Sequence, residues 1–87
     1  MHYHYQEIEE ERERQDAKFG TQFHKPIEWL SILMEEVGEV AREVCENHFP
    51  IYKKHDMTNY RKELIQVAAV VKHMLENFDA TGGNYAD

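Results

Sequence analysis

The sequence predicts a small all-α protein, with three helices in each protomer and a helical bundle completed by homo-oligomerisation. Apolar residues recur at steps of three and four in two long segments, which is the spacing of a helix that buries one face. No segment shows the alternation of apolar and polar residues that is typical of strands. The chain of 87 residues fits one domain over 1–87. Because so short a domain buries little surface on its own, we expect a dimer or a tetramer.

Composition and charge argue against several classes of protein. With 41% hydrophobic residues the chain is not a disordered tail, and with 31% charged residues it has no apolar run that could span a membrane. The net charge of −7 disfavours binding to a nucleic acid polymer or an anionic membrane. Cys45 is the single cysteine, and there is no positive and then apolar leader. Together these features predict a reducing, cytoplasmic setting.

The first helix is expected in the polar N-terminal segment. Residues 1–18 contain no proline or glycine and are rich in Glu, Arg and Gln, which are good helix formers. We expect a partly exposed helix that ends at Gly20. Residues 1–10 and 80–87 are expected to form frayed ends of the domain.

The second helix is predicted over 26–46. Pro26 suits its first turn, because the fixed φ and the missing N–H of proline cost little there. Its apolar stripe, which should face a core, consists of Ile27, Leu30, Leu33, Met34, Val37, Val40, Ala41 and Val44. Gly38 interrupts the stripe, and we expect it to allow the close approach of another helix.

The third helix follows a polar loop over 47–57. Asp56 or Thr58 is the expected N-cap. The apolar stripe of this helix consists of Tyr60, Leu64, Val67, Ala68, Val71, Leu75 and Phe78. A short connection favours antiparallel packing of the second and third helices.

An acidic cluster is expected where these two helices meet. Glu36 and Glu39 are three residues apart, Glu35 and Glu39 are four apart, and on the third helix Glu63 and Gln66 are three apart. Side chains at these spacings share one face of a helix. Antiparallel packing would gather their oxygen atoms, and oxygen ligands are what Mg²⁺ or Mn²⁺ requires. A bound cation would also offset the repulsion among the carboxylates.

These acids have two other interpretations. Glutamates on a helix are usually solvated, and Glu28, Glu43 and Glu46 fit that description. A diiron carboxylate site uses a histidine three residues after a glutamate. No glutamate in this chain has that neighbour, which argues against a diiron site.

Two short segments resemble the acidic motif of a known family. Residues 35–39 read Glu-Glu-Val-Gly-Glu, and residues 63–66 read Glu-Leu-Ile-Gln. This arrangement is similar to that of the MazG-like, all-α nucleoside triphosphate pyrophosphohydrolases, and the flanks over 29–44 and 60–75 look like the small phage-type branch. With the similar N-terminal segment, the resemblance covers residues 12–78.

One position departs from the family pattern. The family has an aspartate as its fourth metal ligand, where this chain has Gln66. An amide can coordinate a cation through its oxygen but brings no charge. We therefore expect weaker metal binding, and turnover reduced with it, compared with the family pattern.

The resemblance implies hydrolysis between the α and β phosphates of a (deoxy)nucleoside triphosphate, with Mg²⁺ or Mn²⁺ as cofactor. It implies four metal ligands: Glu36, Glu39, Glu63 and Gln66. Glu35 or Glu39 would act as the base, and spacing does not decide between them. The alternatives are a catalytically weakened MazG-like protein that binds a nucleotide or a protein partner, and a purely structural oligomerisation module.

Five further residues are candidates for substrate binding. Trp29 could stack on a nucleobase, or anchor the core or an interface. His73 and Asn77 continue the face of Glu63 at helical spacing, so they either face the same cavity or form an exposed flank. Arg61 and Lys72 are the candidates for contacts with phosphate.

Overall fold

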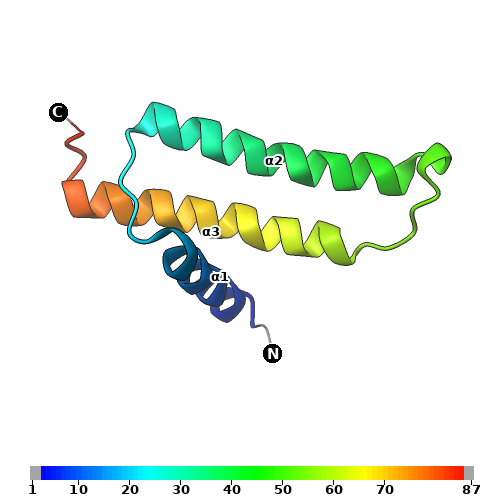
Figure 1. Cartoon of the computed structure of the whole chain (residues 1–87), viewed down its shortest axis with the longest axis horizontal. Helices are drawn as coiled ribbons and strands as arrows, with labels where there is room; N and C mark the ends of the chain where they lie inside the picture. Colours follow the sequence, from blue (N-terminus) through cyan, green and yellow to red (C-terminus); the bar gives the residue numbers. More distant parts are fainter. Residues whose placement is uncertain (1–2, 86–87) are drawn as a thin grey trace.

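The computed structural model describes residues 3–85, and all the regular structure within them is helical. Helix α1 spans His4–Phe19, α2 spans Pro26–His48 and α3 spans Thr58–Thr81. A short 3₁₀ helix, η1 (Pro50–Tyr52), lies in the connection between α2 and α3. Helices α2 and α3 run side by side and antiparallel, and α1 packs against α3 (Figure 1). The all-α prediction is confirmed.

Helix α1 ends where the sequence predicts. Gly20 follows it with a φ of 72°, a conformation that favours glycine, and the Gly20 N–H donates to the Asp16 carbonyl at 2.8 Å. The expected frayed ends, 1–10 and 80–87, include the start of α1 and the last residues of α3. Helical structure begins at His4 and continues to Thr81, whereas residues 1–2 and 86–87 lie outside the described part of the chain.

Helix α2 begins at Pro26 as predicted and runs to His48, two residues beyond the predicted end. The carboxylate of Glu28 accepts a hydrogen bond from the Lys25 N–H at 2.8 Å. This contact satisfies one of the backbone donors that precede the first turn of a helix.

Helix α3 begins at Thr58, but neither predicted residue is its N-cap. Met57 occupies that position, and Asp56 instead accepts a hydrogen bond from the Thr58 N–H at 2.9 Å. Gly82 ends the helix in the left-handed conformation, with a φ of 63°, where a side chain would be strained.

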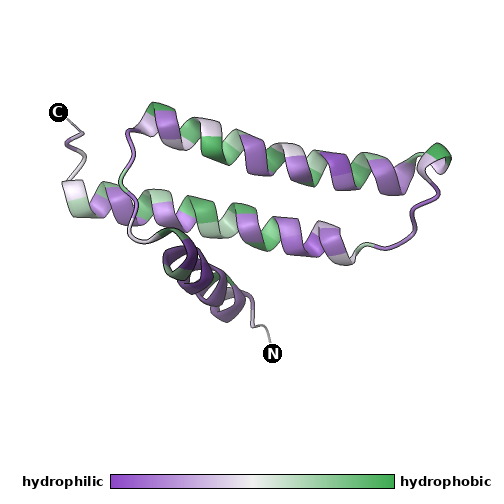
Figure 2. Ribbon diagram, in the orientation of Figure 1, coloured by the Kyte–Doolittle hydropathy of each residue, from purple (hydrophilic) through white to green (hydrophobic). Residues whose placement is uncertain are grey.

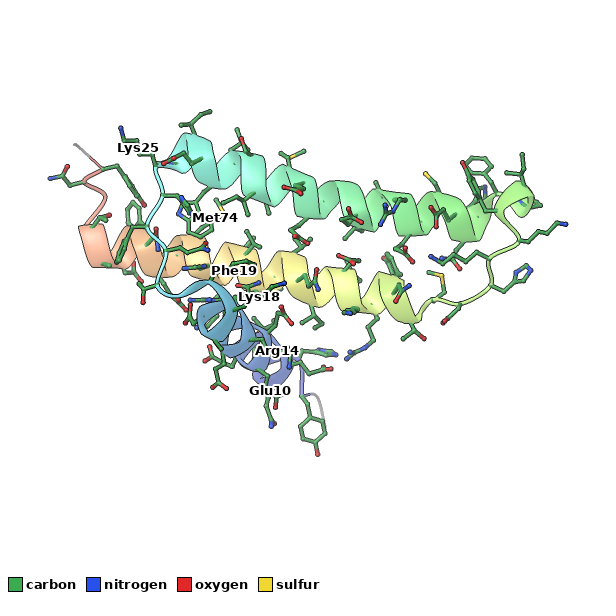
Figure 3. All side chains as sticks on the ribbon, viewed as in Figure 1. Glu10, Arg14, Lys18, Phe19, Lys25 and Met74 are labelled. Carbon is green, nitrogen blue, oxygen red and sulfur yellow. The ribbon has the colours of Figure 1, made fainter. Side chains whose placement is uncertain are left out.

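The core of the single chain is small. Among residues 3–85, the buried apolar residues are Trp29, Ala69 and Val70. Met74 lies between α2 and α3 (Figure 3). Most of the apolar stripe residues remain exposed, among them Ile27, Leu30, Met34, Val37, Val44, Leu64, Val71, Leu75 and Phe78. The expectation that both stripes face a core therefore holds only in part within one chain.

Gly38 does not serve a close approach between helices of this chain. A Cβ atom added to it would meet nothing within 4 Å, so the expectation for this glycine is wrong for the single chain. Figure 2 shows apolar residues along the whole length of α2 and α3, whereas α1 is almost entirely hydrophilic.

Charged side chains fasten the hydrophilic α1 to α3. Arg12 is buried, and its guanidinium donates to Glu76 at 3.2 and 2.5 Å and to Asp16 at 3.1 Å. The Arg12 hydrogen bond lowers the pKa of Glu76 from 4.5 to about 2. These contacts hold α1 beside the part of α3 that carries the candidate site.

Candidate functional site

Two carboxylates and one amide meet between α2 and α3. With its nitrogen turned inward, the Gln66 amide donates to Glu36 Oε2 at 3.1 Å and to Glu63 Oε2 at 3.0 Å. Hydrogen bonding decides which end of an amide carries the nitrogen. The opposite orientation would leave the amide oxygen facing acceptors only. Antiparallel packing thus brings together Glu36, Glu63 and Gln66, from both predicted segments.

Glu36 has a perturbed environment. Burial raises its pKa above the usual 4.5, and the negative charges of Glu63, Glu35, Glu39 and Glu11 raise it further. The influence of Glu11 means that α1 adds a carboxylate to this region. Sequence reasoning missed this residue, because Glu11 is one of many glutamates in α1 and no motif distinguishes it.

The four predicted metal ligands do not all converge. Glu39 forms an ion pair with Arg42 on its own helix, whereas Glu36 and Glu63 share the Gln66 amide. Among residues 3–85, no three Asp, Glu, His or Cys side chains are grouped so that they could hold a metal ion. A cation here would depend on two carboxylates and on donors of other kinds.

The donor set nevertheless fits a hard dication. Mg²⁺ is usually held by one or two carboxylates, and water and substrate phosphates complete its octahedral shell. Glu36 and Glu63 supply two carboxylates whose oxygens lie at 3.1 and 3.0 Å from one atom of Gln66. The Gln66 amide also carries an oxygen that can coordinate a cation.

A pocket of about 260 Å³ adjoins the carboxylates. It is bordered by α1, the α1–α2 link, α2 and α3, through Gln15, Phe19, Gln22, Trp29, Ile32, Glu36, Val70 and His73. Phe19, at the end of α1, lies next to α3 (Figure 3). Glu36 belongs to this pocket and also to the carboxylate pair. The pocket therefore combines aromatic walls, two amide side chains and an acidic edge.

Trp29 and Asn77 are structural residues of this region. Trp29 is 2% exposed, and its Nε1 donates to Asn77 Oδ1 at 2.9 Å. Asn77 Oδ1 also accepts from the His24 N–H at 3.1 Å, and Asn77 Nδ2 donates to the Gln22 carbonyl at 3.0 Å. Asn77 thus fixes the α1–α2 link, and its contacts give no support to a role in substrate binding.

His73 is buried rather than on an exposed flank. Its ring packs edge-on against Trp29, with 4.6 Å between the ring centroids. Burial lowers the pKa of His73, and the positive charge of Arg12 lowers it further. His73 is therefore a neutral wall of the pocket near neutral pH.

The two predicted phosphate contacts pair with acids of α1. Arg61 donates to the carboxylate of Glu7 at 2.7 and 2.6 Å. Lys72 forms ion pairs with Glu9 at 2.5 Å and with Glu76 at 2.8 Å. Arg61 lines a second pocket, of about 330 Å³, but its positive charge, like that of Lys72, is already matched within the chain.

Comparison with known proteins finds no family model that matches the chain, no similar curated protein and no similar solved structure. The resemblance to MazG-like enzymes therefore stays an interpretation of the sequence. No helix within residues 3–85 combines the length and the apolar character needed to cross a membrane.

Proposed function

We propose that this chain is a metal-dependent nucleoside triphosphate pyrophosphohydrolase that cleaves between the α and β phosphates. One observation carries the proposal: Glu36 belongs both to the carboxylate pair and to the aromatic pocket. A nucleotide has the same two parts side by side, a polyanion that needs a cation and a flat ring that needs apolar walls. The resemblance of segments 35–39 and 63–66 to the MazG-like motif supports the same function.

The cation would be held by Glu36 and Glu63, with the Gln66 oxygen as a neutral third donor. When bound, Mg²⁺ or Mn²⁺ supplies positive charge that neutralises the phosphate oxygens. Without it, the net charge of −7 would repel the substrate. The resemblance also makes Glu39 a ligand, but its ion pair with Arg42 would have to open first.

Glu35 is a better candidate than Glu39 for the general base, the group that accepts the proton of the attacking water. It lies beside Glu36 on α2, close enough for its charge to raise the pKa of Glu36. Glu39 is already paired with Arg42, and this ion pair would have to open before Glu39 could face the attacking water. In the proposed reaction Glu35 accepts a proton from the attacking water, and the water oxygen bonds to one of the two phosphorus atoms. The bond from that phosphorus to the oxygen that bridges the α and β phosphates breaks, so the products are a nucleoside monophosphate and pyrophosphate.

The nucleobase of the substrate would enter the pocket beside Glu36. Phe19, Trp29 and His73 supply its ring-lined walls, and aromatic faces stack on nucleobases. Gln15 and Gln22 also line it, and each amide can offer both a donor and an acceptor to a base. Trp29 acts here as a fixed wall held by Asn77, not as a mobile stacking residue.

We also propose that the chain works as a homo-oligomer. The exposed stripe residues of α2 and α3 lie on two helices that pack side by side. A second copy that covers them would complete a four-helix bundle. Apolar surfaces of this kind are uncommon on monomers and usually mark an interface.

Gln66 favours a second candidate function. With the amide nitrogen between Glu36 and Glu63, the site has a neutral occupant in place of the acidic ligand of the family pattern. A weakened descendant would still bind a nucleotide, or a protein partner, without cleaving it.

The test is pyrophosphate release from a panel of nucleoside and deoxynucleoside triphosphates, with Mg²⁺ and with EDTA. We expect release only with Mg²⁺, and a loss of about 100-fold or more in Glu36→Gln. Glu13→Gln, an exposed acid of α1, is the matched control and should retain activity. Metal-dependent nucleotide binding without pyrophosphate release would favour the weakened descendant. If the protein neither binds nor cleaves a nucleotide, both the enzyme and the nucleotide-binding descendant are excluded.

A further inference from the structure

We infer that the amide nitrogen of Gln66 takes the place of the cation between Glu36 and Glu63, and that this exchange is reversible. In the metal-free protein its amide nitrogen joins the two carboxylates, and on metal binding the amide turns to present its oxygen. The second half of this inference rests on the proposed function, because it requires a cation between Glu36 and Glu63. The first half concerns the metal-free chain alone.

The first half of the inference rests on the geometry of the Gln66 bridge, the contact of its amide nitrogen with both carboxylates. With the amide nitrogen turned inward, Gln66 Nε2 lies 3.1 Å from Glu36 Oε2 and 3.0 Å from Glu63 Oε2, so a single atom bonds to carboxylates of two helices. An amide nitrogen carries two hydrogens, one for each acceptor. Hydrogen bonds to ionised acceptors are stronger than neutral ones. The bridge therefore holds α2 to α3 at the point where their carboxylates would otherwise repel.

The chemistry of the amide carries the second half. The last torsion of a glutamine side chain is broad and roughly two-fold. Half a turn exchanges the nitrogen and the oxygen while the other atoms stay in place. The oxygen then points to the same position, and a cation there would have two carboxylate oxygens and one amide oxygen as neighbours. Neither Asp nor Glu can make this exchange, because both ends of a carboxylate are oxygens.

The consequence is a site that is stable without metal and binds metal less tightly. A carboxylate at position 66 would add a third negative charge to the metal-free protein and raise its affinity for the cation. Gln66 removes that repulsion, but its two hydrogen bonds must break before a cation can bind. Gln66 is thus a positioning residue that sets the metal concentration at which the site fills.

The first test follows the Gln66 side-chain amide by NMR in the ¹⁵N-labelled full chain, with its signal assigned by its absence in Gln66→Met. In EDTA we expect its protons to exchange with water more slowly than those of Gln6, which bonds Glu10 at an exposed site. On addition of Mg²⁺ the signal should shift, and its exchange should become faster. Exchange in EDTA as fast as that of Gln6 would overturn the bridge.

The second test compares melting temperatures of wild type, Gln66→Glu and Gln66→Met. In EDTA we expect both variants to melt about 5 °C or more below wild type, because both lose charge-assisted hydrogen bonds. Gln66→Glu should melt lowest, and Mg²⁺ should raise its melting temperature more than that of wild type. Gln66→Met should gain less than wild type, because it offers no oxygen.

The outcomes separate the two halves. Equal melting of all three proteins in EDTA would overturn the bridge. If the metal-free results are as expected but Mg²⁺ changes neither the NMR signal nor any melting temperature, the turn of the amide is overturned together with the proposed metal function. The bridge itself would then stand as a structural contact.

Discussion

His73 and Asn77 lie four residues apart on α3 and have different roles in the same buried region: Asn77 makes hydrogen bonds, and His73 packs against a ring. Asn77 satisfies the Trp29 indole and two backbone groups of the α1–α2 link, which would be costly to bury without partners. His73 packs on the same indole and must be neutral to stay buried. The polar residues at this end of α3 therefore define the shape of the candidate pocket.

A dependence of stability on pH follows from His73. Its pKa is lowered in the folded chain, first by burial and then by Arg12, so the unfolded chain binds the proton more readily. The contribution of neutral His73 to stability is therefore present above about pH 6.5, the ordinary pKa of histidine, and is lost as the pH falls. Glu76 and Asp16 also face His73 and act in the opposite direction, but more weakly than burial.

We expect the free energy of unfolding of wild type, measured with urea, to fall between about pH 7.5 and pH 5.5. Because Gln does not ionise, His73→Gln should show a smaller fall over that range, and it should cost about 1 kcal/mol at the higher pH through the lost ring contact. His55→Gln, in the exposed α2–α3 connection, should behave as wild type. An equal fall in all three proteins would contradict the argument.

Several site residues could be anticipated from spacing alone. Glu36, Glu63 and Gln66 meet because helical steps of three, combined with antiparallel packing, determine which side chains face each other. The role of Asn77 could not be anticipated. Its partners include backbone groups of the α1–α2 link, and the course of that link does not follow from periodicity.

At the scale of elements, ion pairs join α1 to α3. Arg12 pairs with Glu76, Lys72 pairs with Glu9, and Arg61 pairs with Glu7. The composition of residues 4–19 predicts that α1 is a helix. Because α1 has no apolar stripe, however, the sequence does not show which helix α1 packs against. The bounds of α2 and α3 were easier to predict, because Pro26 and two apolar stripes mark them. The Met57 cap was missed because methionine is not a usual N-cap residue.

The contact between Arg12 and Glu76 predicts a second effect of pH. The folded pKa of Glu76 is about 2, below its usual 4.5, so its contribution to stability is present above about pH 4.5 and is lost as the pH falls towards 2. Arg12→Met should lower the free energy of unfolding by about 2 kcal/mol near neutral pH. This cost is modest for a buried arginine, because the Glu76 side chain is 40% exposed and solvent screens the pair.

The measurement is urea unfolding of wild type and Arg12→Met from about pH 7 down to pH 2.5. The difference between the two proteins should shrink as Glu76 becomes protonated. Arg14→Met is the control, because Arg14 pairs with Glu11 within α1 at an exposed site, and it should cost less than about 0.5 kcal/mol. A difference that stays constant with pH would mean that Arg12 acts through packing alone.

At the scale of the whole molecule, some residues of the apolar stripes are covered within the chain, whereas others are exposed. Leu33 and Val40 are half-buried in the single chain, whereas Leu30 is 48% exposed and Leu75 is 59% exposed. Periodicity identifies all of these residues as members of apolar stripes. It does not say whether the surface that covers them belongs to the same chain or to another copy. The fold of one chain was therefore easier to predict than its assembly.

Self-association is the last prediction, and it concerns this exposed surface. We expect a solution mass at a multiple of the chain mass at micromolar concentration, because α2 and α3 leave large apolar residues of both stripes exposed. Leu30→Glu and Leu75→Glu should each shift the equilibrium to monomer, since a carboxylate buried without a partner is costly.

Ile51→Glu changes an equally apolar residue, 82% exposed on η1, and should leave the mass unchanged. Sedimentation equilibrium separates these outcomes. A monomeric wild type would contradict the prediction. Dissociation by Ile51→Glu but not by Leu30→Glu would place the interface at the α2–α3 connection instead.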